Sequence, residues 1–308
     1  MNILITGATG LIGSALAERL LGDKGYSLYC QSRGAAKNAT EVRWILMDLV
    51  HDSWGAHNLP NIDVIYHFAG QTSTYSARQD QMQDLEANVI GFLRLLMHFK
   101  QQDCPPFVVL AGTVTQAGLV ESNQIDEKIK DRPITFYDIS KLTAEMYLSQ
   151  FVKEGWIRGC TLRLANVYGG GWVGQQSDRG VIDKIFRKAL NGENLTIYGD
   201  GICLRDYIYI DDVVSAFLLA SKSAENTNGQ TYCVGTGLGV TLNDAFYKVA
   251  SLASSITGNK VQCLKVPSPP GLSPIEFRNT VVDSSAFRKA TGWAPLYDLD
   301  SGLNTAYR

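Results

Sequence analysis

The feature that most constrains this chain is its first thirteen residues, which join a strand-like run to a glycine-rich turn and a helix. Residues 2–6 form an apolar run long enough for a buried strand, and Gly7, Gly10 and Gly13 then recur at every third position. Apolar residues follow at every fourth position, as expected for a helix with one buried stripe: Ile12, Leu16 and Leu20. A strand, a glycine turn and a helix in this order are typical of a dinucleotide-binding site.

Each glycine has a separate role in such a turn. Gly7 permits the tight bend, Gly10 lets the backbone approach a pyrophosphate, and Gly13 lets the helix pack closely on the strand. The spacing is G-x-x-G-x-x-G rather than G-x-G-x-x-G, and a glycine trio alone also occurs in ordinary turns. Because a strand precedes the turn and a helix follows it, we favour cofactor binding. The predicted contacts in this segment are Gly7, Thr9, Gly10, Leu11, Ile12 and Gly13.

Composition excludes several other classes of protein. A chain of 308 residues with 45% hydrophobic and 19% charged residues fits a soluble globular protein, with one large domain and a smaller lobe. The net charge of −2 gives no reason to expect nucleic acid or a membrane as partner, and no apolar stretch approaches the ~20 residues that span a bilayer. The N-terminus leads directly into a core strand, so we expect no signal peptide and a cytoplasmic location. The six cysteines are scattered, which favours buried thiols over a metal site.

Apolar runs alternate with helical patterns over about 165 residues. The predicted strands are residues 2–6, 26–31, 42–47, 64–68, 107–111 and 160–166, and the predicted helices lie near 11–22, 81–103 and 136–154. This alternation predicts an α/β fold with a Rossmann-type, doubly wound parallel sheet. We assign residues 1–167 and 206–235 to the dinucleotide-binding domain, and 168–205 and 236–308 to a smaller C-terminal α/β lobe that binds substrate.

The smaller lobe has its own pattern of elements. We expect a helix over residues 179–190, strands over 195–198 and 207–210, and a helix from Asp211 to Ala220. A further helix over 284–291 and a last helix at the end of the chain complete the prediction.

The end of the second predicted strand bears on cofactor choice. An NAD site usually has an acidic residue about 20 positions beyond the glycines, whereas this chain has Gln31-Ser32-Arg33. A guanidinium and a hydroxyl suit a 2′-phosphate better than a bare 2′-hydroxyl. We therefore expect NADP to be preferred, with Ser32 and Arg33 as contacts. Arg33 as an ordinary surface residue, and NAD as the cofactor, remain alternatives.

Other residues at strand ends are candidates for contact with the cofactor. Asp48 either accepts a hydrogen bond from the adenine amino group or caps the segment that follows it. His67 is expected to be a packed strand residue, while the small residues after it let backbone lie against the cofactor. Asn88 either ties its helix to the sheet edge or is solvated. The predicted contacts beyond the glycine turn are Ser32, Arg33, Asp48, Leu49, Phe68, Ala69, Gly70, Asn88, Ala111, Tyr137, Lys141 and Val167.

The chemistry is expected where a strand over 107–111 leads into Thr113 and a helix begins at Tyr137. Tyr137 and Lys141 are four residues apart and so share one helix face. Ile139, Leu142 and Met146 are expected on the opposite, buried face. A free phenol has a pKa of about 10, and a nearby ammonium lowers it. Tyr137 can then exchange a proton with a substrate oxygen that Thr113 holds; a chance surface pair is the alternative.

These residues together resemble the extended short-chain dehydrogenases/reductases that act on nucleotide sugars. The likeness is carried by Gly7-Ala8-Thr9-Gly10-Leu11-Ile12-Gly13, His67-Phe68-Ala69-Gly70, Asn88-Val89-Ile90-Gly91, Thr113, Tyr137 with Lys141, Arg163-Leu164-Ala165-Asn166-Val167-Tyr168-Gly169, Tyr198-Gly199-Asp200-Gly201 and Arg205-Asp206-Tyr207. The resemblance implies a catalytic set of Thr113, Tyr137 and Lys141, and hydride transfer at a sugar carbon of a nucleotide-diphosphate sugar, with C4 expected. It also implies substrate contacts at Gln71, Thr113, Asn166, Arg205 and Arg278, and a homodimer.

Two departures from the family pattern refine the expected activity. Dehydratases of this group carry an acidic pair after the catalytic threonine, where this chain has Val114 and Thr115, so dehydration is not expected. The missing acid at the position of Gln31 favours an NADPH-dependent keto-sugar reductase. A redox-neutral 4-epimerase with tightly bound NAD is the main alternative, and a non-catalytic NADP sensor is a distant one.

Overall fold

The structure is a computed structural model that describes residues 1–34, 42–122, 124–170, 180–270 and 274–307. Its centre is a parallel sheet of seven strands in the order β11-β7-β5-β4-β1-β2-β3. The strands are β1 (Asn2–Thr6), β2 (Ser27–Ser32), β3 (Arg43–Leu46), β4 (Val64–His67), β5 (Phe107–Thr113), β7 (Arg158–Leu164) and β11 (Thr231–Val234). The strand order reverses between β1 and β4, which confirms the predicted Rossmann-type sheet and places its ligand-binding edge there.

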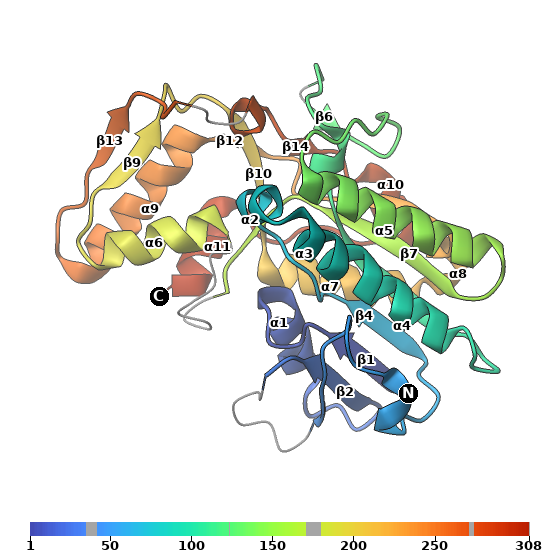
Figure 1. Cartoon of the computed structure of the whole chain (residues 1–308). Helices are drawn as coiled ribbons and strands as arrows, with labels where there is room; N and C mark the ends of the chain where they lie inside the picture. Colours follow the sequence, from blue (N-terminus) through green and yellow to red (C-terminus); the bar gives the residue numbers. More distant parts are fainter. Residues whose placement is uncertain (35–41, 123, 171–179, 271–273, 308) are drawn as a thin grey trace.

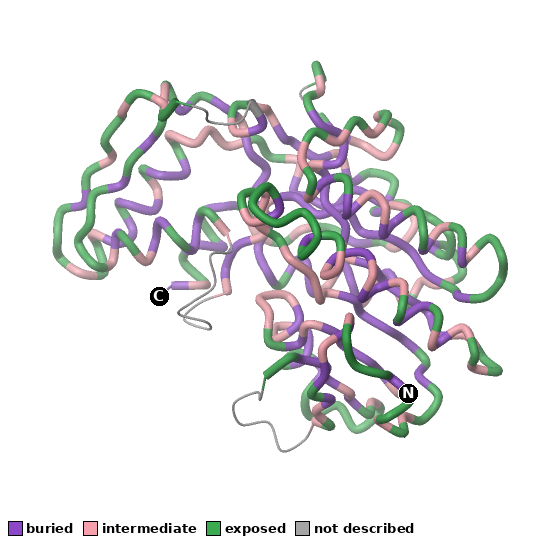
Figure 2. Tube along the Cα trace, viewed as in Figure 1, coloured by how far each residue is buried: buried purple, intermediate pink, exposed green. Residues whose placement is uncertain are grey.

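Helices cover both faces of this sheet (Figure 1). Along β1, Ile3 and Ile5 belong to one apolar core with α1 (Leu11–Leu20) and α7 (Ile210–Lys222). Leu4 points to the other face, into a second core with α4 (Gly91–Phe99) and α5 (Phe136–Lys153). This alternation follows from the two-residue period of a strand. Buried residues accordingly run along the strands between the two helical layers (Figure 2).

The predicted helix over 81–103 is corrected in two respects. It is divided into α3 (Gln81–Leu85), a π-helical turn η2 (Glu86–Ile90) and α4, and it ends at Phe99. A π-turn inserts extra backbone per turn and so rotates the residues before it relative to those after it. Val89 and Leu96 are buried as predicted, but Met82 and Leu85 are exposed. The apolar stripe is therefore not continuous core.

The buried face of α5 also differs from the prediction. Ala144 and Leu148 pack in the core, whereas Ile139 and Met146 are exposed and Leu142 is only partly buried. Residues 141, 144, 148 and 151 recur at helical spacing, so Lys141 lies on the same face as the apolar contacts to the sheet. The prediction was wrong because the polar lysine was assigned to the open face.

The smaller lobe projects from the body at the left of Figure 1. It contains α6 (Val181–Leu190) packed on α9 (Leu242–Thr257), with β9 (Leu195–Tyr198) paired to β13 (Cys263–Val266). A three-stranded sheet of β8 (Asn166–Tyr168), β10 (Leu204–Tyr209) and β12 (Gly239–Thr241) connects it to the body. The prediction placed residue 179 in the helix, which lies outside the described residues, and began β10 three residues late.

The remaining described elements are short connections and the C-terminal segment. They are η1 (Trp54–His57), α2 (Thr74–Gln79), η3 (Val114–Ala117), β6 (Gln124–Ile125), α8 (Ala224–Thr227), η4 (Pro274–Phe277), β14 (Val281–Val282), α10 (Ser285–Thr291) and α11 (Leu299–Tyr307). α10 packs on β11 and α8, and the Trp293 indole donates to the Asp212 carbonyl at 3.1 Å. Part of the segment assigned to the smaller lobe thus returns to the larger body, and the domain division remains a proposal.

Two general expectations can be compared with the structure. The six cysteines carry free thiols; Cys30, Cys160, Cys203 and Cys233 are buried as predicted, whereas Cys104 is exposed and Cys263 is only partly buried. Within the described ranges, no helix combines the length and apolar character needed to cross a bilayer.

Candidate active site

The turn between β1 and α1 has the backbone geometry of a pyrophosphate cradle. Gly7 has a φ of +65°, and a Cβ there would lie 2.7 Å from the Ala69 nitrogen at the end of β4. A Cβ on Gly13 would lie 2.4 Å from the Gly7 carbonyl oxygen, so the helix and the turn meet without space for a side chain. Gly10 caps α1 without a side-chain hydrogen bond, and the first helical turn holds no acidic residue. The first N–H groups of α1 are therefore available to an anion, and the cradle fits a dinucleotide.

Residues around this cradle become more accessible where their strands end. Ile5 and Tyr66 are buried within β1 and β4, whereas many of the predicted contacts near the ends of the strands are exposed or only partly buried. These partly accessible residues include Thr9, Gly10, Leu11, Ile12, Phe68, Ala69, Gly70, Ala111 and Val167. Other predicted contacts are buried: Gly13, Ser32, Leu49, Asn88 and Lys141.

Gln31 lies at the end of β2, where an NAD site usually has an acidic residue. Its Oε1 accepts a hydrogen bond from the Gly7 N–H at 3.0 Å, and its Nε2 donates to the Met47 carbonyl at 2.7 Å. Ser32 is buried and donates its hydroxyl proton to the Gly34 carbonyl, while Arg33 is exposed. A neutral amide thus braces the glycine turn, and no carboxylate from residues 31–33 faces the ribose position.

Two candidates at strand ends have structural roles. Asp48 Oδ1 accepts from the Val50 and His51 N–H groups at 2.8 and 3.2 Å, so the predicted cap is present; contact with adenine stays a prediction. His67 is buried and lies 2.8 Å from the Thr6 hydroxyl through Nδ1. Burial, assisted by the Lys141 charge, lowers the pKa of His67 to about 3. The neutral, packed His67 agrees with the prediction.

Asn88 of the π-turn is buried beside Gly70, which follows β4. Its Nδ2 donates to Asp84 Oδ1 at 2.9 Å, and a Cβ on Gly70 would lie 2.5 Å from its Oδ1. Gln71 Nε2 also donates to Asp84 Oδ1, at 3.0 Å, and to the Ser73 carbonyl. Asn88 is therefore buried and not solvated. Asp84, only 1% exposed, is a site residue that sequence reasoning missed.

Tyr137 and Lys141 lie in the first turns of α5. Tyr137 is partly buried, and Lys141 is only 8% exposed. Burial lowers the pKa of Lys141 to about 8, against the charges of Glu145 and Asp84, which raise it. The ammonium therefore lies among His67 of β4, Asp84 of α3 and its own helix. Lys141 was predicted to face a cleft, and the structure places it at the junction of α5, α3 and the end of β4.

Thr113 ends β5 and begins a row of polar groups. Its hydroxyl lies 2.9 Å from that of Thr115, and the Thr115 hydroxyl donates to Asp138 Oδ1. Asp138 directly follows Tyr137 on α5 and is fully buried. Thr115 and Asp138 were not predicted as site residues. They are 23 positions apart, and only the tertiary structure brings them into contact.

The two predicted substrate arginines lie together, but they differ in their contacts. Arg205 donates to the carbonyls of Leu204 at 3.0 Å, Glu276 at 2.8 Å and Arg278. Arg278 has Nε and Nη1 buried with no hydrogen-bond partner among the described residues. Burial lowers the pKa of Arg278 to about 10, and the Arg205 charge adds to this effect while Asp138 opposes it. A guanidinium whose Nε and Nη1 lack hydrogen-bond partners, and which lies beside a second guanidinium, is suited to binding an anion.

The polar cluster behind the site is structural. Arg163 of β7 makes paired hydrogen bonds to Asp131 and to Glu145, with distances of 2.6–2.9 Å. This pairing orients Glu145 one helical turn beyond Lys141. Asn166, another predicted contact, is partly buried on β8, where the three-stranded sheet leaves the body.

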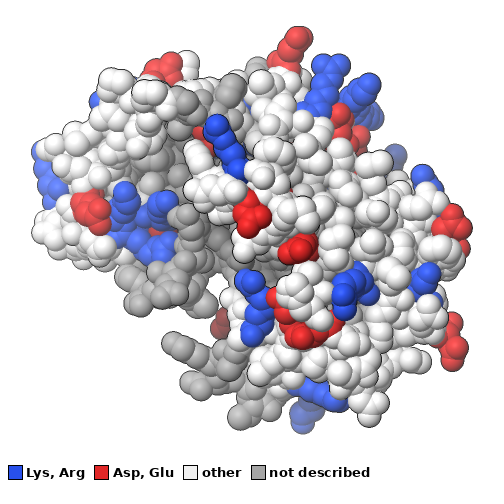
Figure 3. Space-filling model, viewed as in Figure 1, with Lys and Arg blue, Asp and Glu red and all other residues white. Residues whose placement is uncertain are grey.

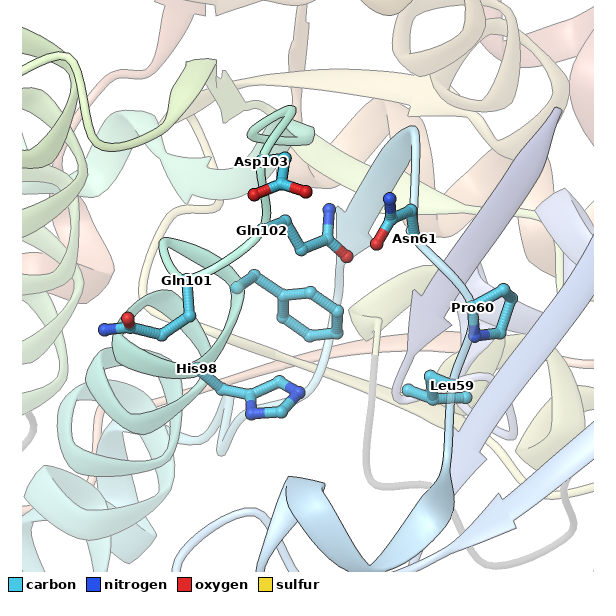
Figure 4. A pocket seen from close by; sticks show the side chains of 8 residues that line it. Leu59, Pro60, Asn61, His98, Gln101, Gln102 and Asp103 are labelled. Atoms are coloured by element: carbon cyan, nitrogen blue, oxygen red, sulfur yellow. The ribbon is translucent and has the colours of Figure 1, made fainter.

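A cavity of about 220 Å³ lies away from these residues. Leu59, Pro60 and Asn61 form one side and the end of α4 forms the other (Figure 4). It adjoins the segments that enter β4 and β5, at the opposite edge of the sheet from the glycine turn, so we do not assign it to the site. Figure 3 shows a recess between the smaller lobe and the body, with basic side chains gathered over α6.

The fold and this site define a dinucleotide-dependent enzyme of the short-chain dehydrogenase/reductase type. Residues 3–235 match the model of the NAD dependent epimerase/dehydratase family, and the chain belongs to that family. It is 27% identical to UDP-glucose 4-epimerase of Mycolicibacterium smegmatis, over 98% of this chain and 96% of the relative.

Solved structures show the same likeness. UDP-glucose 4-epimerase of Thermotoga maritima with UDP-glucose superimposes with a TM-score of 0.88 at 29% identity, covering 99% of this chain and 97% of that one. UDP-glucose 4-epimerase of Thermus thermophilus in complex with NAD gives 0.84 at 28%, with the same coverage. These relatives support the epimerase alternative and do not support the reductase or the NADP preference.

Proposed function

We propose that this protein is a redox-neutral 4-epimerase of a nucleotide-diphosphate sugar, with a UDP-hexose as the first candidate substrate. The observation that carries the proposal is the buried Lys141 ammonium one helical turn from Tyr137, on the helix whose Asp138 accepts from the Thr115 hydroxyl next to Thr113. The relatives that bind UDP-glucose or are named for it support the substrate class.

In the proposed mechanism, Arg278 would bind the diphosphate of the sugar nucleotide and the glycine turn would bind the pyrophosphate of the dinucleotide. Lys141 stabilises the Tyr137 phenolate, which takes the proton from the sugar 4-hydroxyl while Thr113 holds the same oxygen. When bound beside the glycine turn, the dinucleotide would supply the acceptor and the donor for the C4 hydride. Tyr137 then gives its proton back to the sugar oxygen, so that no net redox change occurs.

An assay without added cofactor tests this reaction. Purified protein incubated with UDP-glucose is expected to form UDP-galactose with no change in dinucleotide absorbance, and Tyr137→Phe is expected to lower kcat by about 10²–10⁴-fold. Consumption of NADPH with a 4-keto-6-deoxy sugar nucleotide, in place of epimerisation, would instead establish the reductase.

We propose that the cofactor site accepts a 2′-phosphate as well as a free 2′-hydroxyl. Gln31 places no negative charge beside the ribose, and the exposed Arg33 follows it. Mass spectrometry of the dinucleotide released from purified protein, with NAD⁺ and NADP⁺ dissociation constants for wild type and Arg33→Ala, checks this. Equal loss of both affinities in Arg33→Ala would refute a specific role for Arg33.

We further propose a homodimer formed through α5 and α3, which pack against each other. Ile139 and Met146 of α5 and Met82 of α3 are 48%, 63% and 63% exposed, an unusual exposure for apolar side chains on neighbouring helices. Light scattering is expected to give a dimer for wild type and a monomer for Met146→Glu. A dimer in both would exclude this surface. The free buried thiols fit a reducing compartment, so a cytoplasmic location is part of the proposal.

A further inference from the structure

The backbone of Gly169 and Gly170, which follows β8, reaches from the smaller lobe to the glycine turn. A Cβ on Gly170 would overlap the Leu11 side chain, so the two residues are in contact without space for a side chain at position 170. Leu11 is the first residue of α1 and a predicted contact of the dinucleotide. The segment after β8 therefore lies directly against the turn that is proposed to bind the cofactor pyrophosphate.

Asp183 of α6 holds this backbone from the side of the smaller lobe. Its Oδ1 accepts a hydrogen bond from the Gly169 N–H at 3.2 Å and another from the Tyr307 hydroxyl. The residue is only 9% exposed, and its Oδ2 is buried without a hydrogen-bond partner in the described ranges. Burial raises the pKa of Asp183, but these contacts do not depend on its charge, because Oδ1 can accept while a proton resides on Oδ2.

Tyr307 is held in place by its ring, so that its hydroxyl is directed to Asp183. The ring stacks on Phe186 of α6 with the centroids 3.8 Å apart, and α11 lies beside α6 (Figure 1). Just before α11, the carbonyl of Asp298 accepts from the Tyr168 hydroxyl of β8 at 3.1 Å. The C-terminal segment thus joins α6 to β8 and fixes Asp183 relative to the backbone that it holds.

Gly169 and Gly170 have no side chains with which to anchor this segment, so its position depends on backbone contacts. Gly169 has a φ of +101°, and a Cβ there would overlap the Tyr209 ring, so a larger residue is excluded. The hydrogen bond from the Gly169 N–H to Asp183 accordingly does what side-chain packing does in other segments, and its loss leaves the segment freer to move.

We propose that Asp183 and Tyr307 are positioning residues that hold the backbone at 169–170 against Leu11 and thereby slow the release of the dinucleotide. The N–H groups that would bind the pyrophosphate belong to the helical turn that begins at Leu11. Opening of the neighbouring backbone is a local event, whose frequency depends on the few buried contacts that oppose it. The inference rests on a dinucleotide bound at the glycine turn. It accords with the proposed function, because an enzyme that returns the hydride to its substrate has to retain the same cofactor through each cycle.

The test measures how fast NAD⁺ leaves the loaded protein. Each variant is loaded with NAD⁺ and mixed with an excess of etheno-NAD⁺, and the exchange is followed by fluorescence. Tyr307→Phe keeps the ring against Phe186 and removes the hydroxyl, Asp183→Leu removes the acceptor, and Asp183→Asn retains an acceptor oxygen. Tyr232→Phe is the matched control, since the Tyr232 hydroxyl, on the edge strand β11, donates to the Asn226 carbonyl at 3.1 Å.

We expect release to be about tenfold faster in Asp183→Leu and about threefold faster in Tyr307→Phe, as for the loss of one or two buried hydrogen bonds. Asp183→Asn is expected to stay close to wild type, because its Oδ1 can accept both hydrogen bonds. Thermal unfolding is the structural control: Tyr307→Phe and Tyr232→Phe should both lower the Tm, whereas only Tyr307→Phe should speed release.

An unchanged release rate in Tyr307→Phe, or an equal rise in Tyr232→Phe, overturns the inference. A wild-type protein that binds no dinucleotide would overturn both the inference and the cofactor site. A wild-type protein that retains NAD⁺ but does not epimerise UDP-glucose would refute the proposed function alone, because the release rates need no turnover.

Discussion

The glycine turn and the arginine pair are both proposed anion sites, and they are built in opposite ways. The turn offers backbone N–H groups from contiguous residues, and its geometry depends on the absence of side chains at Gly7 and Gly13. The pair offers guanidinium groups from positions 205 and 278, and its geometry depends on what else those groups contact. A site made of backbone is fixed by local sequence, whereas a site made of side chains is decided by the tertiary structure.

The difference is clearest in Arg205. By sequence it is the better candidate for a diphosphate, since it lies in a segment that resembles the family. In the structure, its guanidinium joins β10 to the segment before β14 by donating to carbonyls, and Arg278 keeps its donors available. Two arginines of the same predicted role thus differ: Arg205 is committed to backbone carbonyls, and Arg278 has Nε and Nη1 without a partner among the described residues.

The largest effect is expected from a substitution that disrupts the glycine turn between β1 and α1. Gly13→Ala places a Cβ 2.4 Å from the Gly7 carbonyl oxygen, a backbone atom that cannot rotate away. We expect a loss of about 3 kcal/mol, or roughly 100-fold in dinucleotide affinity, together with a lower Tm. Gly22→Ala is a control for glycine replacement, because a Cβ there meets nothing within 4 Å, although its φ of +81° adds some strain. Fluorescence titration with NAD⁺ measures the affinity, and an unchanged value for Gly13→Ala would refute the cradle.

The next prediction separates the two arginines. Arg278→Met is expected to raise KM for the sugar nucleotide by about 10- to 100-fold, as for a charged hydrogen bond, with no loss of Tm. Arg205→Met removes a donor from the carbonyls of Glu276 and Arg278, while the Leu204 carbonyl keeps the Thr280 N–H at 3.0 Å, and is expected to cost about 2 kcal/mol or more of stability. Steady-state kinetics and thermal unfolding on both variants provide the comparison. If Arg205→Met raised KM and kept its Tm, the division of roles would be reversed.

Much of the fold was predictable because parallel strands are buried on both faces and so appear as apolar runs. β1 and β9 match their predicted bounds, and the other predicted strands agree within a few residues. The glycine turn and the Tyr137–Lys141 spacing are equally local. Local sequence therefore predicts the path of the backbone and shows which residues, four positions apart, share one face of a helix.

The errors have a common physical origin. The π-turn at 86–90 and the outward position of Ile139 and Met146 depend on which neighbour each helix meets, which periodicity alone does not state. Asp84 and Asp138 were missed because an acid on a helix is usually solvated. Only the packing of α3 and α5 against the strand ends shows that both carboxylates are buried beside proposed catalytic groups.

The smallest expected effect concerns one of these carboxylates and sharpens the contrast between backbone and side-chain sites. Asp84→Asn keeps an oxygen for Gln71 and Asn88 but removes a charge that raises the pKa of Lys141. The pKa of Lys141, about 8 in wild type, then falls, so the ammonium is lost at lower pH.

Activity that requires the ammonium should accordingly decline earlier on the alkaline side. We expect the alkaline limb of the kcat/KM profile to move down by about half to one pH unit, with little change at acidic pH. Asp80→Asn, which neutralises an exposed cap of the same helix α3, should leave the limb in place. A limb that stays fixed in Asp84→Asn, or that moves equally in Asp80→Asn, would show that Lys141 does not respond to this buried charge, and its role beside Tyr137 would need another explanation.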